Sequence, residues 1–135
     1  MSPIIRKSEL PGSTMLEGRH EILHTISWQV RSNIWSPPTD FYETEEAYVV
    51  RVEIAGMQED NFEVTVENNI LLIKGVRPDI SERRAYHQME IRFGKFATAV
   101  GLPGPVDLER ATAEYKDGFL TVTLPMAKPN QIKVE

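Results

Sequence analysis

Apolar and polar residues alternate along several short stretches of this chain, with the period that places side chains on opposite faces of a β-strand. The clearest stretch is 119–125, in which Leu120, Val122 and Leu124 share one face and threonines share the other. Pro125 ends it, because proline has no N–H to donate to a ladder. We therefore predict a strand that buries the face with these three residues.

The same pattern predicts about seven strands between residues 36 and 126. Asn68 with Asn69 and Asp117 with Gly118 stand between apolar runs and tolerate the positive φ that tight hairpins need. The predicted strands are 40–44, 48–54, 62–67, 70–75, 86–100 with a bend at Gly94, 111–116 and 119–125. Many short strands separated by turn residues indicate an all-β fold, a two-sheet β-sandwich.

Residues 1–35 differ from this β-rich part, and Pro37 and Pro38 mark the boundary. From residue 16 onward, apolar residues fall at helical spacing. One interpretation is a helix packed on its own domain; the favoured one is a partly helical or disordered arm that contacts other subunits or client proteins. The apolar residues of this arm are Ile4, Ile5, Leu16, Leu23, Ile26, Trp28, Val30 and Ile34.

The chain ends on a short segment, 127–135, in which Ile132 and Val134 flank a lysine. We call these two residues the tail motif. Nothing follows them that would bury their side chains. An extended segment of this kind binds most economically as an added strand on a sheet edge, with its two apolar side chains in pockets. The edge that receives it is expected to belong to another copy of the chain.

Composition narrows the classes of function. The 15 basic and 20 acidic residues give a net charge of −5, which argues against nucleic acid or an anionic membrane as the main partner. The chain has no cysteine, so disulfides and thiol chemistry are excluded. Without a long apolar run or a signal-peptide core near residue 1, we expect a cytoplasmic protein.

Candidate chemistry is sparse. His20 and His24 stand four residues apart, and a helix would place both on one face, as zinc ligands require. With His87 they support, weakly, a metal-dependent hydrolase. No Gly-x-Ser-x-Gly motif occurs, and the prolines of segment 101–105 remove N–H groups that a phosphate loop needs. We therefore expect no enzyme activity and no cofactor.

Several stretches together resemble the small heat shock proteins, the Hsp20-like family built on the α-crystallin domain. They are Trp-Ser-Pro-Pro-Thr-Asp at 35–40, Val-Glu-Ile-Ala-Gly-Met at 52–57, the run from Tyr86 to Pro103, the segment 113–125 around Asp-Gly-Phe-Leu, and the tail motif. The resemblance covers about residues 35–135. It divides the chain into an N-terminal arm (1–35), an α-crystallin domain (36–126) and a C-terminal extension (127–135).

The resemblance implies an immunoglobulin-like sandwich and a stress-response chaperone that holds unfolding proteins without ATP. It also implies homodimers and larger homo-oligomers. The tail motif of one subunit is expected in a groove of another, formed by Val64, Val66, Ala111, Ala113, Tyr115, Leu120 and Val122. A loop with Arg77, Ile80, Arg83 and Arg84 is expected at the dimer interface. The alternative is a monomeric p23-like co-chaperone or adaptor.

One position departs from the pattern of this family. Where the family commonly has an arginine in the long strand, the chain has Thr98. The ion pairs that such an arginine makes cannot form here. The loop at 76–85 also looks short, so the resemblance leaves open whether the dimer exchanges strands.

Overall fold

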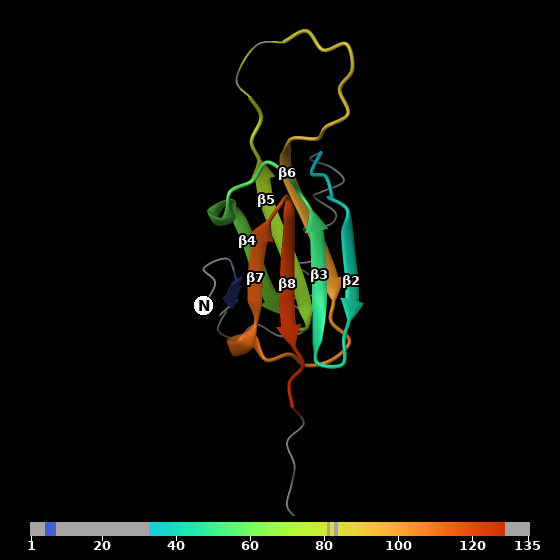
Figure 1. Cartoon of the computed structure of the whole chain (residues 1–135), viewed down its shortest axis with the longest axis vertical. Helices are drawn as coiled ribbons and strands as arrows, with labels where there is room; N and C mark the ends of the chain where they lie inside the picture. The colour runs from blue at the N-terminus through green and yellow to red at the C-terminus, as the bar shows by residue number, and fades with distance from the viewer. Residues whose placement is uncertain (1–4, 8–32, 81, 83, 129–135) are drawn as a thin grey trace, which may run out of the picture.

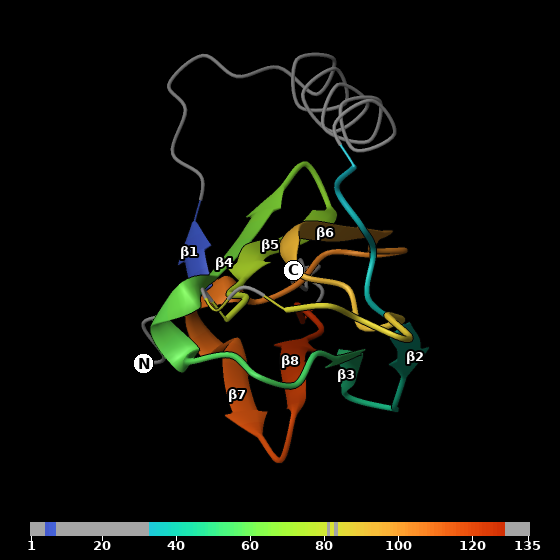
Figure 2. The ribbon, with the colours of Figure 1, turned by 90° about the horizontal axis from the view of Figure 1, so that it is seen from above.

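The computed structural model describes residues 5–7, 33–80, 82 and 84–128, with no side-chain detail for 5–7. Two four-stranded sheets face each other, in the orders β1-β4-β5-β6 and β2-β3-β8-β7 (Figures 1 and 2). The strands are β1 (Ile5–Lys7), β2 (Thr39–Glu43), β3 (Ala47–Glu53), β4 (Phe62–Glu67), β5 (Ile70–Arg77), β6 (Gly94–Gly101), β7 (Thr112–Lys116) and β8 (Phe119–Pro125). Short 3-10 helices occupy Glu59–Asn61 and Leu108–Arg110. The sandwich expected from the sequence is confirmed.

The core lies between the sheets, and the predicted strand phase is correct. Leu120, Val122 and Leu124 of β8 have no exposed surface. Val50 and Val52 of the neighbouring β3 are equally buried, as is Ile54 just beyond it. Apolar side chains of this size contribute about 1.5–3 kcal/mol each when fully buried. Because a shift of one residue would turn every such side chain to the opposite face, the alternation determines the register.

Both predicted hairpin turns are present. Asn68 and Asn69 have φ of 51° and 61° and connect β4 to β5. Asp117 and Gly118 have φ of 52° and 83° and connect β7 to β8. Two consecutive positive φ values match the right-handed twist of the flanking strands, which explains the choice of asparagine, aspartate and glycine.

The long strand predicted at 86–100 is wrong in its first half. Only Gly94–Gly101 forms β6, antiparallel to β5. β5 in turn continues to Arg77, which pairs with Gly94, so the connecting loop spans 78–93 rather than 76–85. Met89, Ile91 and Phe93 alternate as in a strand, but within the described parts of the chain residues 86–93 make no ladder. A strand needs a hydrogen-bonding neighbour, and the alternation alone does not supply one.

The strand β1 was not anticipated from the sequence. It pairs in parallel with β4 in the register Ile5 to Val64, Arg6 to Thr65 and Lys7 to Val66. The segment is three residues long, too short for a periodicity signal. Its partner strand is distant in sequence, so only the tertiary structure reveals the pairing. β1 forms one outer edge of its sheet, beside β4 in Figure 2.

Candidate assembly surfaces

The residues expected to form the tail groove come from both sheets, on the side of the sandwich where β4 and β7 lie (Figures 1 and 2). At one end, the rings of Phe62 and Tyr115 pack with their centroids 5.1 Å apart. The Tyr115 hydroxyl donates to the Ile54 carbonyl at 2.8 Å and accepts from the Met57 N–H at 3.3 Å. The ring contact joins β7 to the opposite sheet, and the two hydrogen bonds join β7 to the segment that follows β3, so the two walls of the expected groove are connected at this end.

Most of the residues expected to form the groove are buried in this structure. Val64, Leu120 and Val122 have no exposed surface, and Val66 and Ala111 are only 6% and 7% exposed. Ala113 and Tyr115 are half-buried. The structure therefore brings the predicted set together between the sheets, but as core and not as an open channel. On the β4 side, the backbone edge that a tail strand would use is paired with β1.

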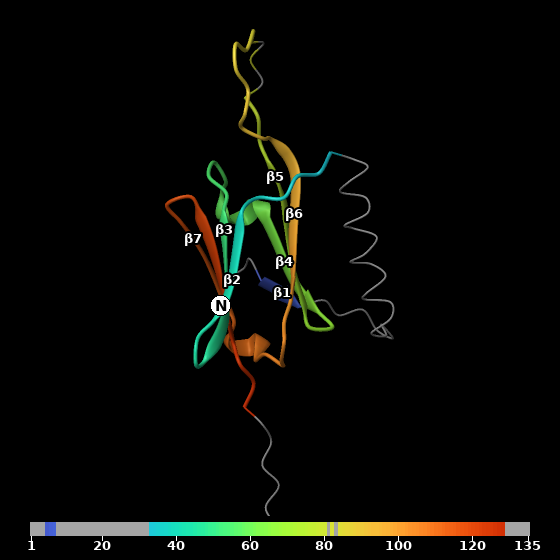
Figure 3. The same cartoon turned by 90° about the vertical axis from the view of Figure 1, so that its right-hand side faces the viewer.

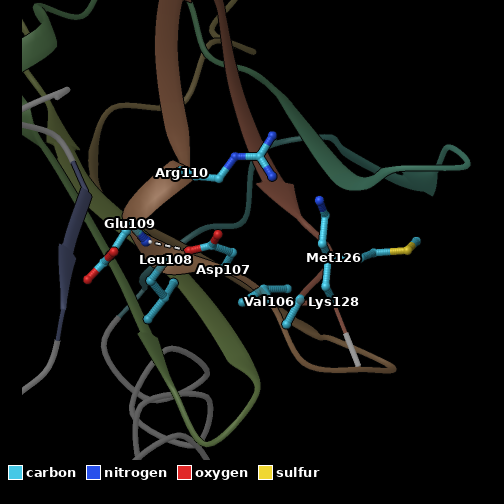
Figure 4. A pocket seen from close by; sticks show the side chains of 8 residues that line it. Val106, Asp107, Leu108, Glu109, Arg110, Met126 and Lys128 are labelled. Carbon is cyan, nitrogen blue, oxygen red and sulfur yellow. Dashed lines mark hydrogen bonds between the residues drawn. The ribbon is translucent and has the colours of Figure 1, made fainter. Parts of the chain in front are cut away.

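The C-terminal segment is anchored to the sandwich up to residue 127. Met126 N–H donates to the Glu46 carbonyl at 2.9 Å, and Ala127 N–H donates to the Pro105 carbonyl at 3.0 Å. A hollow of about 590 Å³ lies beside this anchor, between residues 106–110 and 126–128 (Figure 4). In it the Asp107 carboxylate accepts from the Glu109 N–H at 3.2 Å. The tail motif itself lies outside the described residues.

The loop 78–93 exposes several apolar side chains to solvent. Tyr86, Met89 and Ile91 are 49%, 59% and 64% exposed, and Ile80 is 54% exposed. The loop extends past the end of both sheets (Figures 1 and 3). Of the other expected loop residues, Arg84 is exposed and Arg83 lies outside the described residues. Exposed apolar groups gathered on one segment are typical of an interaction surface.

Arg77, expected within this loop, is instead the last residue of β5 and lies at the root of the loop. Its Nε donates to the Arg92 carbonyl at 2.8 Å, and its Nη2 donates to the same oxygen. Its guanidinium carbon lies 4.5 Å from the ring centroid of Trp35 and 5.6 Å from that of Phe93. Burial lowers the pKa of Arg77, while Tyr115 acts in the opposite direction. The guanidinium stays charged at neutral pH and joins the two ends of the loop.

β2 is one of the two outer strands of the second sheet, and it also exposes aromatic residues. Phe41 and Tyr42 are 37% and 47% exposed. At the beginning of β2, the Thr39 hydroxyl is hydrogen-bonded to the Thr98 hydroxyl of β6 at 3.0 Å. Thr98 is only 9% exposed, so a neutral hydroxyl pair occupies the position where the family commonly has a charge. Together, β2 and the loop provide one free strand edge and one unpaired apolar segment.

Most of the predicted client-binding arm falls outside the described residues: Ile4, Leu16, Leu23, Ile26, Trp28 and Val30. Ile5 is described only as backbone, within β1, and Ile34 is half-buried. Trp35, at the end of the predicted arm, packs in the core with its ring centroid 5.8 Å from that of Phe96. Trp35 therefore belongs to the core of the sandwich, although the sequence placed it at the end of the arm.

Of the three histidines that suggest a metal site, the structure describes only His87. Across residues 33–80, 82 and 84–128, no group of three His, Cys, Asp or Glu side chains is arranged to hold a metal ion. His20 and His24 lie outside these ranges, and His87 is exposed on the loop. Within the described part of the chain, no helix has the length and apolar character to cross a bilayer.

Comparison with known proteins identifies the family. The model of the Hsp20/alpha crystallin family matches residues 40–135, well over half of the chain. The chain belongs to this family. Small heat shock protein C4 of Rickettsia felis is 36% identical over 104 residues, which cover 76% of this chain and 64% of that protein. The 17.7 kDa class II heat shock protein of Arabidopsis thaliana is 38% identical over 100 residues, which cover 71% of this chain and 64% of that protein.

Solved structures of the family have the same fold. Heat shock protein 16.0 from Schizosaccharomyces pombe superposes with a TM-score of 0.63 at 30% identity, over 74% of this chain and 94% of that chain. A small heat-shock protein from Xylella fastidiosa gives 0.63 at 28% identity, over 75% of this chain and 97% of that chain. The latter is described as having a distinct high order structure. The resemblance inferred from the sequence motifs is thus confirmed.

Proposed function

We propose that this chain is an ATP-independent chaperone that binds unfolding proteins and prevents their aggregation, and that it works as a homodimer and larger homo-oligomer. The observation that supports this best is the cluster of exposed apolar side chains on the loop 78–93 of an otherwise well-packed α-crystallin sandwich. Relatives named as small heat shock proteins support the same class of activity. No observation favours a monomeric p23-like adaptor. We infer no catalytic step and no cofactor, and a cytoplasmic location.

In the proposed dimer, the loop of one subunit supplies the strand that the other lacks. Met89, Ile91 and Phe93 stand at alternate positions of the loop, with Met89 and Ile91 exposed, and β2 has a free edge. Pairing the two would bury these side chains and satisfy backbone groups on both segments. Ile80, Arg83 and Arg84 would lie in or beside this contact.

Larger assembly would then depend on the tail motif. Ile132 and Val134 of one subunit would dock beside β4 of another, against Val64, Val66 and the β7 and β8 residues named above. Two apolar side chains contribute about 3–6 kcal/mol before the cost of ordering. Each attachment is weak, so subunits exchange, while many tails together hold the assembly by effective concentration.

The test is the solution mass, measured by light scattering. We expect the full chain to form a large assembly and the variant with Ile132→Ala and Val134→Ala to shrink towards dimers. A chain with Gln131→Ala alone is the control, because it changes a polar neighbour and leaves both apolar residues. If the double variant keeps the wild-type mass, the tail motif does not hold the assembly. If the full chain is a monomer, the oligomer model fails.

A further inference from the structure

We propose that the strand β1 is an intrachain cap of β4, and that the tail motif of another subunit must displace it to bind. This inference rests on the proposed docking of the tail beside β4. Its physical basis is that a sheet edge offers one row of backbone donors and acceptors and pairs with one added strand at a time. In this structure that row on β4 is taken by Ile5–Lys7.

The position of β1 coincides with the expected tail site. β1 pairs with Val64, Thr65 and Val66, and two of these three are residues expected to receive the tail. Both valines are buried, at 0% and 6% exposure, so neither is available to a tail in this conformation. On its other side β4 pairs with β5 along its whole length. The edge under β1 is therefore the remaining edge through which a strand can join β4.

The two segments are also chemically alike. Ile5-Arg6-Lys7 and Ile132-Lys133-Val134 each begin with an isoleucine followed by a basic residue. Each is short enough to bind weakly by itself. Because β1 belongs to the same chain as β4, its effective concentration at β4 is high and does not depend on the protein concentration. A tail then binds only the fraction of subunits in which β4 is free, which weakens its apparent affinity by that fraction.

The cap is tested by fixing β1 in place with a disulfide. The chain has no cysteine, so Arg6→Cys with Thr65→Cys introduces the only two thiols. These residues are in register, and neighbouring strands lie about 4.8 Å apart, within the span that a disulfide bridges. Arg6→Cys with Glu63→Cys is the matched control. Glu63 lies on β4 like Thr65, but two residues earlier. Its Cα is about 8 Å from that of Arg6, a separation that a disulfide cannot bridge without backbone movement.

The readout is binding of a fluorescent peptide with the sequence of residues 129–135. It is measured by anisotropy on full-length chains that carry Ile132→Ala and Val134→Ala, so that their own tails do not compete. We expect the in-register pair to form a disulfide within one chain, seen as a monomer on a non-reducing gel whose two cysteines no longer react with a maleimide. Oxidation should weaken peptide binding about tenfold, and reduction should restore it. A chain lacking residues 1–7 should bind at least as tightly as the reduced protein.

Each other result has a distinct meaning. If the in-register pair forms no disulfide, or forms it only between chains, β1 is not an intrachain cap. If the disulfide forms within the chain and peptide binding is unchanged, β1 and the tail do not share an edge. The proposed competition between β1 and the tail is then wrong, but the docking of the tail is not contradicted. If no variant binds the peptide, including the one without residues 1–7, tail docking beside β4 and the competition fail together.

Discussion

Val122 illustrates how tightly single residues are constrained in this sandwich. It has no exposed surface, lies in register with Val50 of β3 and Ala113 of β7, and belongs to the core between the sheets. Its neighbour Thr121 is on the opposite face and half-buried. A polar side chain is therefore tolerated at position 121 and not at position 122.

We therefore expect Val122→Asp to unfold the domain. An unpaired carboxylate in the core costs several kcal/mol, a large part of the total stability of a domain of this size. Thr121→Asp places the same charge on the other face, between Arg51 of β3 and Glu114 of β7, and should change stability by less than about 1 kcal/mol because the two neighbours have opposite charges. Urea unfolding followed by circular dichroism measures both. A normal transition for Val122→Asp would mean that the strand phase is off by one.

Thr98 stands at the position where the family commonly has an arginine. The sequence shows that an arginine is missing and that its ion pairs cannot form. The structure shows what replaces them, a hydrogen bond of 3.0 Å between the Thr98 and Thr39 hydroxyls across the two sheets. Thr39 stands one residue before the predicted strand 40–44, so no feature of the sequence indicates that these two positions pair.

At the scale of elements, the loop 78–93 is held at its root by Arg77. The guanidinium donates twice to the Arg92 carbonyl and packs against the rings of Trp35 and Phe93. It also donates to the Ala55 carbonyl at 3.4 Å. Only an arginine presents several N–H groups in one plane while stacking on an aromatic ring. The side chain thereby sets where the loop leaves the sandwich.

We expect Arg77→Lys to loosen the loop without unfolding the sandwich. Lysine keeps the charge but loses the planar fork, at a cost of about 1 kcal/mol. Chymotrypsin should then cut after Phe93 about fivefold faster, since this ring is half-buried against Arg77 in the parent chain. Arg51→Lys is the control. The Arg51 guanidinium stacks on the ring of Phe119, 4.2 Å from its centroid, and this pair is not part of the loop. Equal cleavage rates in the parent chain and both variants would contradict this role of Arg77.

At the scale of the whole molecule, the sandwich and the arm are expected to divide the work. Among the residues whose side chains the structure describes, the core cluster extends from Trp35 to Leu124, so we expect the sandwich to keep a hydrophobic core without residues 1–34. Client proteins expose varied apolar segments, which adaptable side chains such as methionine, isoleucine and tryptophan accommodate. The arm carries several of these residues.

We expect a chain without residues 1–34 to fold normally and to suppress the aggregation of a heated client protein several-fold less well. Light scattering of the client measures suppression, and circular dichroism checks the fold. A chain without residues 1–7 is the control, because it loses β1 and keeps most of the arm. If the chain without residues 1–34 is as active as the full chain, the client site lies on the sandwich itself.

The sequence by itself determined the strands β2–β5, β7 and β8, most of the buried face and both hairpins, because these depend on local alternation and on turn residues with positive φ. Its motifs also identified the family. The tertiary structure alone decided the extent of β6, the place of Arg77 and the pairing of β1 with β4. A strand edge is defined by its neighbour, and neighbours distant in sequence leave no periodic signal. For the same reason, residues 89–93 alternate as a strand does and yet lie in a loop within a single chain.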